Sequence, residues 1–268
     1  MERLQPQSDE QFAEVLSVQQ RERRWRGIIL TGSEITLLAQ LPELAARARE
    51  AGFERVRIQS HGMKLANPNY LDRLITAGVN EFFISIPGCD SATNDEITQV
   101  PGSWQKAYQG LLNLGAYPQA LAITNSVITR KSFALLPQIV ANLGQLKALK
   151  QMEFWFYWPM TERDERDLVP RFSAAQPYLL AAIAAAEQLG LRVEVKNFPQ
   201  CLLGEYRDRL CNDQPLLLID PAFWQQFERN GFYQCSHRSQ CQSTQCLGLN
   251  SAYLARYGDE RELLQPIS

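Results

Sequence analysis

The first 88 residues of this 268-residue chain contain no cysteine, and the whole sequence has only two histidines. No apolar run approaches the ~18 residues that a membrane-spanning helix needs. The polar start MERLQPQSDEQ is unlike a secretory signal peptide. Positive and negative side chains nearly balance, at 27 and 29, so neither nucleic acid nor an anionic membrane is an expected partner. These absences predict a cytoplasmic protein.

The sequence also lacks a GxGxxG turn, which argues against a dinucleotide-binding Rossmann domain. It does contain a regular alternation of strand-like and helix-like segments. Ser8 and Gln11 form a capping-box pattern that predicts a helix to about residue 24. Strands are expected at 27–31, 55–60, 81–86, 120–129, 151–158 and 191–198, and helices at 41–52, 67–78, 103–114, 132–146 and 171–189. Residues 87–102 are expected to form a loop.

Strands that alternate with helices at a spacing of about 25–35 residues indicate βαβ units and a parallel sheet. We therefore expect an α/β fold, a partial (β/α) barrel over residues 1–200, with a smaller cysteine-bearing extension over residues 201–268. In such a barrel the functional groups lie at the carboxyl ends of the strands. Those ends read TGSEIT, QSHG, ISIPG, TNSVITRKS and YWPM, and their polar, small residues indicate a binding site.

Taken in order, these strand ends resemble the radical S-adenosylmethionine (radical SAM) family over roughly residues 25–160. The resemblance implies that the turn after the first strand holds the amino group of S-adenosylmethionine, and that later strand ends contact its carboxylate and ribose. The implied residues are Gly32, Ser33, Glu34 and Thr36 in the turn, with Ser85, Asn125 and Ser126 at the later strand ends. Two alternatives stay open: Glu34 caps the following helix, or the strand-end hydroxyls are bonded to neighbouring backbone.

The chain departs from the family pattern in two ways. Ser33 and Ile35 replace a glycine and a proline, and SHG replaces the usual TNG. The CxxxCxxC loop that holds the family's catalytic [4Fe–4S] cluster is missing, because no cysteine precedes Cys89. Without three thiolates there is no cluster to cleave the sulfonium. We therefore expect the isolated chain to be inactive in radical chemistry. The CxxxCxxC loop could lie upstream of this sequence, be supplied by a partner chain, or have been lost.

Five of the six cysteines fall between residues 201 and 246. Clustered cysteines in a reducing compartment are more often metal ligands than disulfides. The segments PQCLLG and CSHRSQCQSTQC resemble those of radical SAM relatives with an auxiliary cluster, which implies a [4Fe–4S] cluster on Cys201, Cys235, Cys241 and Cys246. Zinc and ordinary buried thiols remain alternatives. Cys211 is a spare thiol, His237 an alternative ligand, and Cys89 a core or loop thiol.

The resemblance implies a function in modification of a peptide or small molecule, for which the catalytic loop is absent. A non-catalytic subunit that uses an iron–sulfur or zinc site as a scaffold is the alternative. Because the first strand of such a barrel is also missing, the strand at 27–31 should have an open edge. The N-terminal helix and its arm, the sixth strand or another chain could cover this edge. We expect self-association or a partner strand there.

Overall fold

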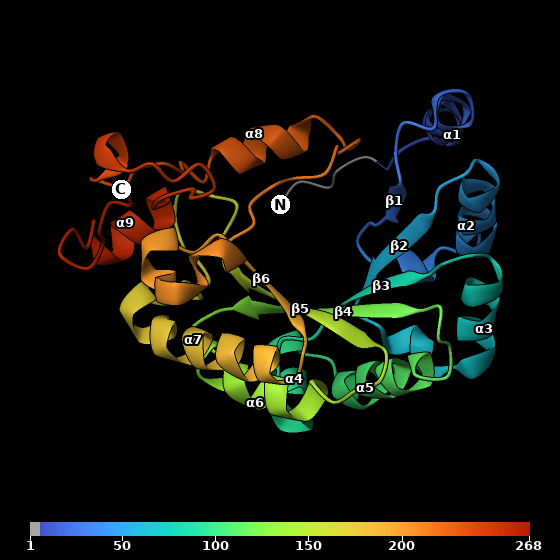
Figure 1. Ribbon diagram of the computed structural model, residues 1–268, viewed down its shortest axis with the longest axis horizontal. Helices are drawn as coiled ribbons and strands as arrows, with labels where there is room; N and C mark the ends of the chain where they lie inside the picture. The colour runs from blue at the N-terminus through green and yellow to red at the C-terminus, as the bar shows by residue number, and fades with distance from the viewer. Residues whose placement is uncertain (1–5) are drawn as a thin grey trace. The chain divides into compact units, whose positions relative to one another are not determined.

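The computed structural model describes residues 6–268, which form one six-stranded sheet with the strands in the order of the chain (Figure 1). The strands are β1 (Gly27–Leu30), β2 (Arg55–Ser60), β3 (Glu81–Ser85), β4 (Leu121–Ile128), β5 (Leu149–Phe156) and β6 (Arg192–Lys196). The first four pair in parallel. A parallel sheet in sequence order, with helical crossovers, is a partial (β/α) barrel, and the predicted fold class is confirmed.

Six helices fall where the periodic pattern predicts them, whereas those over 91–98, 222–228 and 251–257 were not predicted. They are α1 (Asp9–Glu22), α2 (Leu41–Glu50), α3 (Pro68–Thr76), α4 (Ser91–Thr98), α5 (Ser103–Leu114), α6 (Leu136–Leu143), α7 (Phe172–Gln188), α8 (Ala222–Glu228) and α9 (Ser251–Tyr257). Short 3₁₀ helices include η1 (Ile35–Leu37) and η4 (Gln200–Arg209). Among residues 6–268, no helix is long and apolar enough to cross a membrane.

The prediction of a loop over residues 87–102 is wrong, because this stretch contains α4. Asp90 caps the helix by accepting a hydrogen bond from the backbone N–H of Thr93 at 2.9 Å. The side chain of Thr93 completes a capping box in return. Threonine stands where the sequence signature has glutamate or glutamine, so the box is hard to recognise without the structure.

The chain forms two compact units, one of residues 6–125 with 142–151 and the other of residues 126–141 with 152–268. In the first unit, one face of the sheet is covered by helices and is apolar. Val56 and Ile58 of β2 are fully buried there, as are Leu41 of α2 and Leu71 of α3. Alternation along each strand therefore directs the polar residues of β2 and β3 to the other face.

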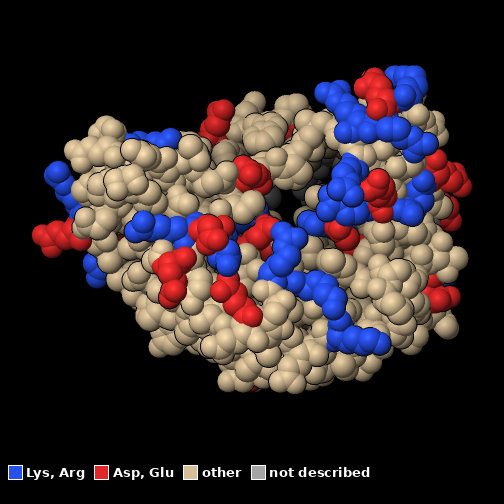
Figure 2. Space-filling model, in the orientation of Figure 1, with Lys and Arg blue, Asp and Glu red and all other residues tan. Residues whose placement is uncertain are grey.

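That other face carries charged side chains that pair across neighbouring strands. Arg57 of β2 is in register with Glu81 of β3, and their side chains meet at 2.8 Å. At the start of β1, Arg26 pairs with Glu54 at 3.0 Å. On the face of the molecule that Figure 2 shows, basic and acidic side chains are likewise intermixed.

In the second unit, an aromatic core fixes the C-terminal region on the barrel helices. Phe172 of α7 stacks on Tyr253 of α9, with ring centroids 4.1 Å apart, and also contacts Phe156 of β5 at 4.4 Å. The hydroxyl of Tyr253 accepts a hydrogen bond from the backbone N–H of Phe172 at 2.9 Å. This anchor holds the segment that follows the cysteine loop.

The two edges of the sheet are β1 and β6. The sixth strand is next to β5 in the strand order and does not close the sheet onto β1. Helix α1 is attached at the start of β1, where the side chain of Gln19 donates to the carbonyl of Trp25 at 2.8 Å and accepts from its N–H at 2.9 Å. Figure 1 shows α1 beyond this end of the strand rather than along it. The N-terminal arm was also expected as a possible cover of the β1 edge. Its residues 1–5 lie outside the described residues.

Candidate cofactor and metal sites

The turn after β1 is organised around the carboxylate of Glu34. Its Oε1 accepts hydrogen bonds from the backbone N–H of Thr36 at 3.0 Å and from the hydroxyls of Thr36 and Ser60 at 2.5 and 2.7 Å. Its Oε2 accepts from the backbone N–H of His61 at 2.9 Å. Glu34 also caps η1, which agrees with the alternative that Glu34 caps the helix after the first strand.

The carbonyl of Thr36 is also occupied within the chain. The ammonium of Lys64 donates to it at 2.7 Å and the hydroxyl of Tyr70 at 3.1 Å. Burial of Glu34 would raise the pKa of its carboxyl, but the hydrogen bonds from Thr36, His61 and Ser60 outweigh burial and hold the pKa below its ordinary value. An ionised Glu34 therefore fastens the turn.

Gly32 and Ser33, in contrast, are exposed and leave their backbone accessible. A Cβ added at Gly32 would have no heavy atom within 4 Å, so a ligand has room to approach the turn there. Ser85 at the end of β3 is exposed as well, and lies in register with Asn125 of β4. These positions, rather than the side chain of Glu34, present free groups at the strand ends of this unit.

Asn125 is 5% exposed, and its Oδ1 has no hydrogen-bond partner among the described residues. The hydroxyl of Thr124 beside it is buried and unpartnered in the same way. Buried polar atoms in folded proteins nearly always have a partner, so these two point to a bound polar ligand or water. Ser126 is buried too, at 1% exposure.

The first unit cannot hold the catalytic cluster that the family resemblance implies. Residues 6–125 and 142–151 contain a single cysteine, Cys89. Cys89 lies in the loop before α4 and is 4% exposed, and its sulfur is 3.5 Å from the hydroxyl of Thr93 in α4. One buried thiol does not provide the three thiolates that the cluster needs.

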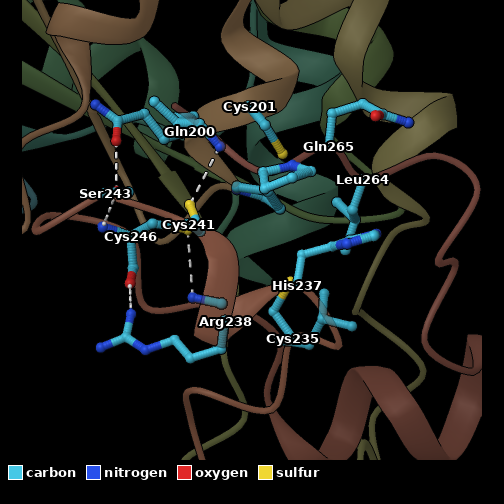
Figure 3. A pocket seen from close by; sticks show the side chains of 15 residues that line it. Gln200, Cys201, Cys235, His237, Arg238, Cys241, Ser243, Cys246, Leu264 and Gln265 are labelled. Atoms are coloured by element: carbon cyan, nitrogen blue, oxygen red, sulfur yellow. Dashed lines mark hydrogen bonds between the residues drawn. The ribbon is translucent and has the colours of Figure 1, made fainter.

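The second unit brings four cysteines to one small cavity of about 30 Å³. Cys201 comes from the start of η4, and Cys235, Cys241 and Cys246 come from the loop between α8 and α9. Figure 3 shows the four around one space, with Cys201 and Cys235 on opposite sides of it. All described cysteines are free thiols.

His237 also lines this cavity, but Cys211 does not. The backbone N–H of Cys211 is bonded instead to the carbonyl of Val195 on β6 at 2.9 Å. The structure therefore separates the four predicted ligands from the spare thiol. It leaves His237 as a neighbour of the site, with its Nε2 3.1 Å from the carbonyl oxygen of Arg261.

The four thiols line one cavity. Among residues 6–268, no three histidine, cysteine, aspartate or glutamate side chains are placed to hold a single metal ion. A tetrahedral zinc with Zn–S bonds of about 2.3 Å would draw its sulfurs to within about 3.8 Å of one another. In a four-iron cluster each thiolate binds a different iron, so the sulfurs stay further apart.

Electrostatics confirm that the thiols are neighbours. Burial raises the pKa of Cys201, and the charges of Cys246, Cys235 and Cys241 raise it further. Burial raises the pKa of Cys235 as well, with added contributions from Cys246 and Cys241. Metal or cluster binding would therefore release protons here.

Two sulfurs already accept backbone hydrogen bonds. The N–H of Ile267 donates to the sulfur of Cys241 at 3.4 Å, and the N–H of Gly248 to that of Cys246 at 3.4 Å. The contribution of residues 264–267 to the cavity wall was missed by sequence reasoning.

Residues 2–125 match the family model described as Radical SAM superfamily. Over 61 residues the chain is 39% identical to the 7,8-dihydro-6-hydroxymethylpterin dimethyltransferase of Methanocaldococcus jannaschii, which is 23% of this chain and 12% of that protein. Over 144 residues it is 26% identical to the AdoMet-dependent heme synthase of Methanosarcina barkeri, which is 53% of this chain and 40% of that protein. The chain therefore spans less than half the length of these curated relatives.

Solved structures show the same fold at low sequence identity. A structure of Streptococcus suis SuiB bound to the precursor peptide SuiA aligns with a TM-score of 0.57 and 15% identity, covering 86% of this chain and 49% of that one. Native anSMEcpe with bound AdoMet aligns with a TM-score of 0.53 and 13% identity, covering 70% and 54%. Residues 2–125, which carry β1, β2, β3 and the start of β4, therefore resemble the radical SAM superfamily in sequence, and the solved structures share the fold of the chain.

Proposed function

We propose that this chain belongs to the radical SAM superfamily and binds an auxiliary-type [4Fe–4S] cluster through Cys201, Cys235, Cys241 and Cys246. One observation carries the proposal: these four thiols, which come from two separate segments of the chain, line a single cavity. Thiolate ligands suit iron–sulfur clusters and zinc alike. The resemblance of PQCLLG and CSHRSQCQSTQC to auxiliary-cluster relatives favours the cluster over zinc.

Four cysteines would occupy all four irons, so this cluster would supply electron transfer or structural support when bound. No iron would keep the open position that sulfonium cleavage requires. The first unit has only Cys89 among its described residues, so no radical step is assigned to them. Such a step in the whole protein would need thiolates from another segment or another chain.

S-adenosylmethionine itself would bind at the strand ends of the first unit. We infer that the exposed backbone of Gly32 and Ser33 approaches its amino group, while Ser85 and the unpartnered Oδ1 of Asn125 contact other polar atoms. Glu34 and Thr36 support this turn from within, because their oxygens are bonded to the chain. Ser126, which the family resemblance named with them, belongs to the other unit.

The substrate class in this proposal is a peptide or a small organic molecule, modified by the chemistry typical of the superfamily. The runner-up is a non-catalytic subunit in which the barrel is a binding scaffold and the metal site is structural. The lone thiol of the first unit favours this second function. The neighbours that bind AdoMet or a precursor peptide favour the first.

The test is anaerobic reconstitution of the chain with iron and sulfide. We expect about four iron atoms per chain and thiolate-to-iron absorption in the visible range. Serine at Cys201, Cys235, Cys241 or Cys246 should reduce the iron content. Cys211→Ser is the matched control, because Cys211 lies outside the cavity, and it should bind iron as the parent chain does. A colourless protein with stoichiometric zinc would overturn the cluster assignment.

A further inference from the structure

Residues 264–267 lie against the cysteine cavity although they are 18 or more positions beyond the last cysteine. Leu264, Gln265, Pro266 and Ile267 all line it. The N–H of Ile267 donates to the sulfur of Cys241 at 3.4 Å, and the carbonyl of Ile267 accepts from the N–H of Gln242 at 2.8 Å. These two bonds hold the segment beside the cysteine loop.

The same segment reaches the cysteine that comes from the other part of the sequence. Gln265 and Cys201 line the cavity together. Leu264 anchors the segment, since its side chain is 1% exposed. Residues 264–267 therefore donate an N–H group to Cys241 and lie against the same cavity as Cys201.

The sulfur of Cys246 obtains its N–H group locally. Gly248 donates to Cys246 two positions before it, at 3.4 Å. Cys246 is thus bonded within its own loop, whereas Cys241 is bonded to a segment that the tertiary structure brings to it.

Resting on the proposed cluster, we propose that residues 264–267 form part of the cluster site and set its redox potential and its resistance to loss. An N–H dipole aimed at a thiolate stabilises negative charge on the sulfur, and outer-shell hydrogen bonds tune cluster potentials. Reduction adds one electron to the cluster, so the more negative reduced state gains more from these N–H groups. Ile267 acts here as a positioning residue through its backbone.

Proline substitution tests the backbone role directly, since proline has no N–H but keeps its carbonyl. Ile267→Pro would remove the donor to Cys241 and retain the acceptor for Gln242. Ile267→Ala is the matched control, because it keeps the N–H and shortens the side chain.

The reconstituted variants are titrated with dithionite as one-electron reductant and then exposed to a chelator. We expect the proline variant to have a more negative midpoint potential and to lose iron about tenfold faster than the parent chain. The alanine variant should match the parent chain. Equal behaviour of the proline, alanine and parent proteins would overturn the proposal, as would equal shifts in the proline and alanine variants.

A second measurement does not require the cluster. In the metal-free chain, removal of residues 264–268 should speed alkylation of Cys201 and Cys241, read by peptide mass spectrometry. The buried Cys89 serves as the internal control. Unchanged alkylation would show that the segment does not cover these sulfurs. Absence of iron uptake by the parent chain, with faster alkylation after truncation, would overturn the cluster and its tuning but leave the cover in place.

Discussion

The backbone N–H of His61 donates to the carboxylate of Glu34 at 2.9 Å, and this bond joins the loop after β1 to the loop after β2. The hydroxyl of Ser60 adds a second link at 2.7 Å. Glu34 itself sits in the turn that would receive S-adenosylmethionine. The turn is therefore positioned by the neighbouring strand before any ligand binds.

We expect Glu34→Gln to destabilise the first unit by about 1–3 kcal/mol, because an amide nitrogen would replace an oxygen that accepts from buried donors. Urea unfolding followed by circular dichroism measures the change. Glu50→Gln is the matched control, since Glu50 is exposed at the end of α2. Equal stability of the two variants would show that the carboxylate does not fasten the loops.

The carboxylate of Glu34 should also make the free energy of unfolding depend on pH. Its pKa in the folded chain lies below the ordinary value of about 4.3. A lowered pKa in the folded state stabilises the protein fully above the unfolded pKa, and that stabilisation is lost as the pH falls through the folded pKa. Unfolding free energies measured from pH 6 to pH 3 should therefore fall less steeply in Glu34→Gln. Parallel pH profiles would contradict the assignment.

The isolated chain should not form 5′-deoxyadenosine from S-adenosylmethionine under dithionite. Cleavage needs an iron with an open position, and the first unit offers only Cys89 among its described residues. Chromatography of the product against a no-protein control measures this. Binding of the intact cofactor, followed by equilibrium dialysis, should survive in the parent chain and weaken in Asn125→Ala. Product above the control level would refute the expectation.

Gly248→Ala should destabilise the protein and reduce its iron content. Gly248 has φ of +68°, and an added Cβ would lie 3.3 Å from Tyr233 Cα and 3.4 Å from Cys235 Cβ. Left-handed backbone alone costs a non-glycine residue about 1–2 kcal/mol. Gly190→Ala is the control, because its φ is +73° but its Cβ would meet nothing within 4 Å. Both variants should lose stability, and only Gly248→Ala should lose iron.

We expect the edge of β1, residues 27–31, to pair with another chain or a second copy. In the strand order β1 is next to β2 alone, and α1 is attached beyond its start rather than along it. An apolar open edge favours strand addition. Sedimentation velocity should show association that Ile29→Lys weakens. A strict monomer at high concentration, with fast amide exchange along 27–31, would show that the edge of β1 stays unpaired and exposed to solvent.

The sequence by itself determined the elements whose signals are local. Ser8 and Gln11 predicted the start of α1, and both halves of their capping box are present. The apolar alternation of residues 55–60 predicted β2 with its bounds. Such patterns are readable because the interacting groups are a few residues apart. The box at Asp90 and Thr93 was missed because threonine there is an uncommon partner.

Only the tertiary structure decided what the site residues contact. Glu34 could be a cofactor ligand or a cap from the sequence alone, and its donor Ser60 lies 26 positions away. The family resemblance named Cys201 beside Cys235, Cys241 and Cys246, and the fold places all four at one cavity. Ile267 reaches Cys241 across 26 positions. Contacts of this kind join residues that are far apart in the sequence and form only when the helices and strands pack together. A local sequence pattern therefore does not predict them.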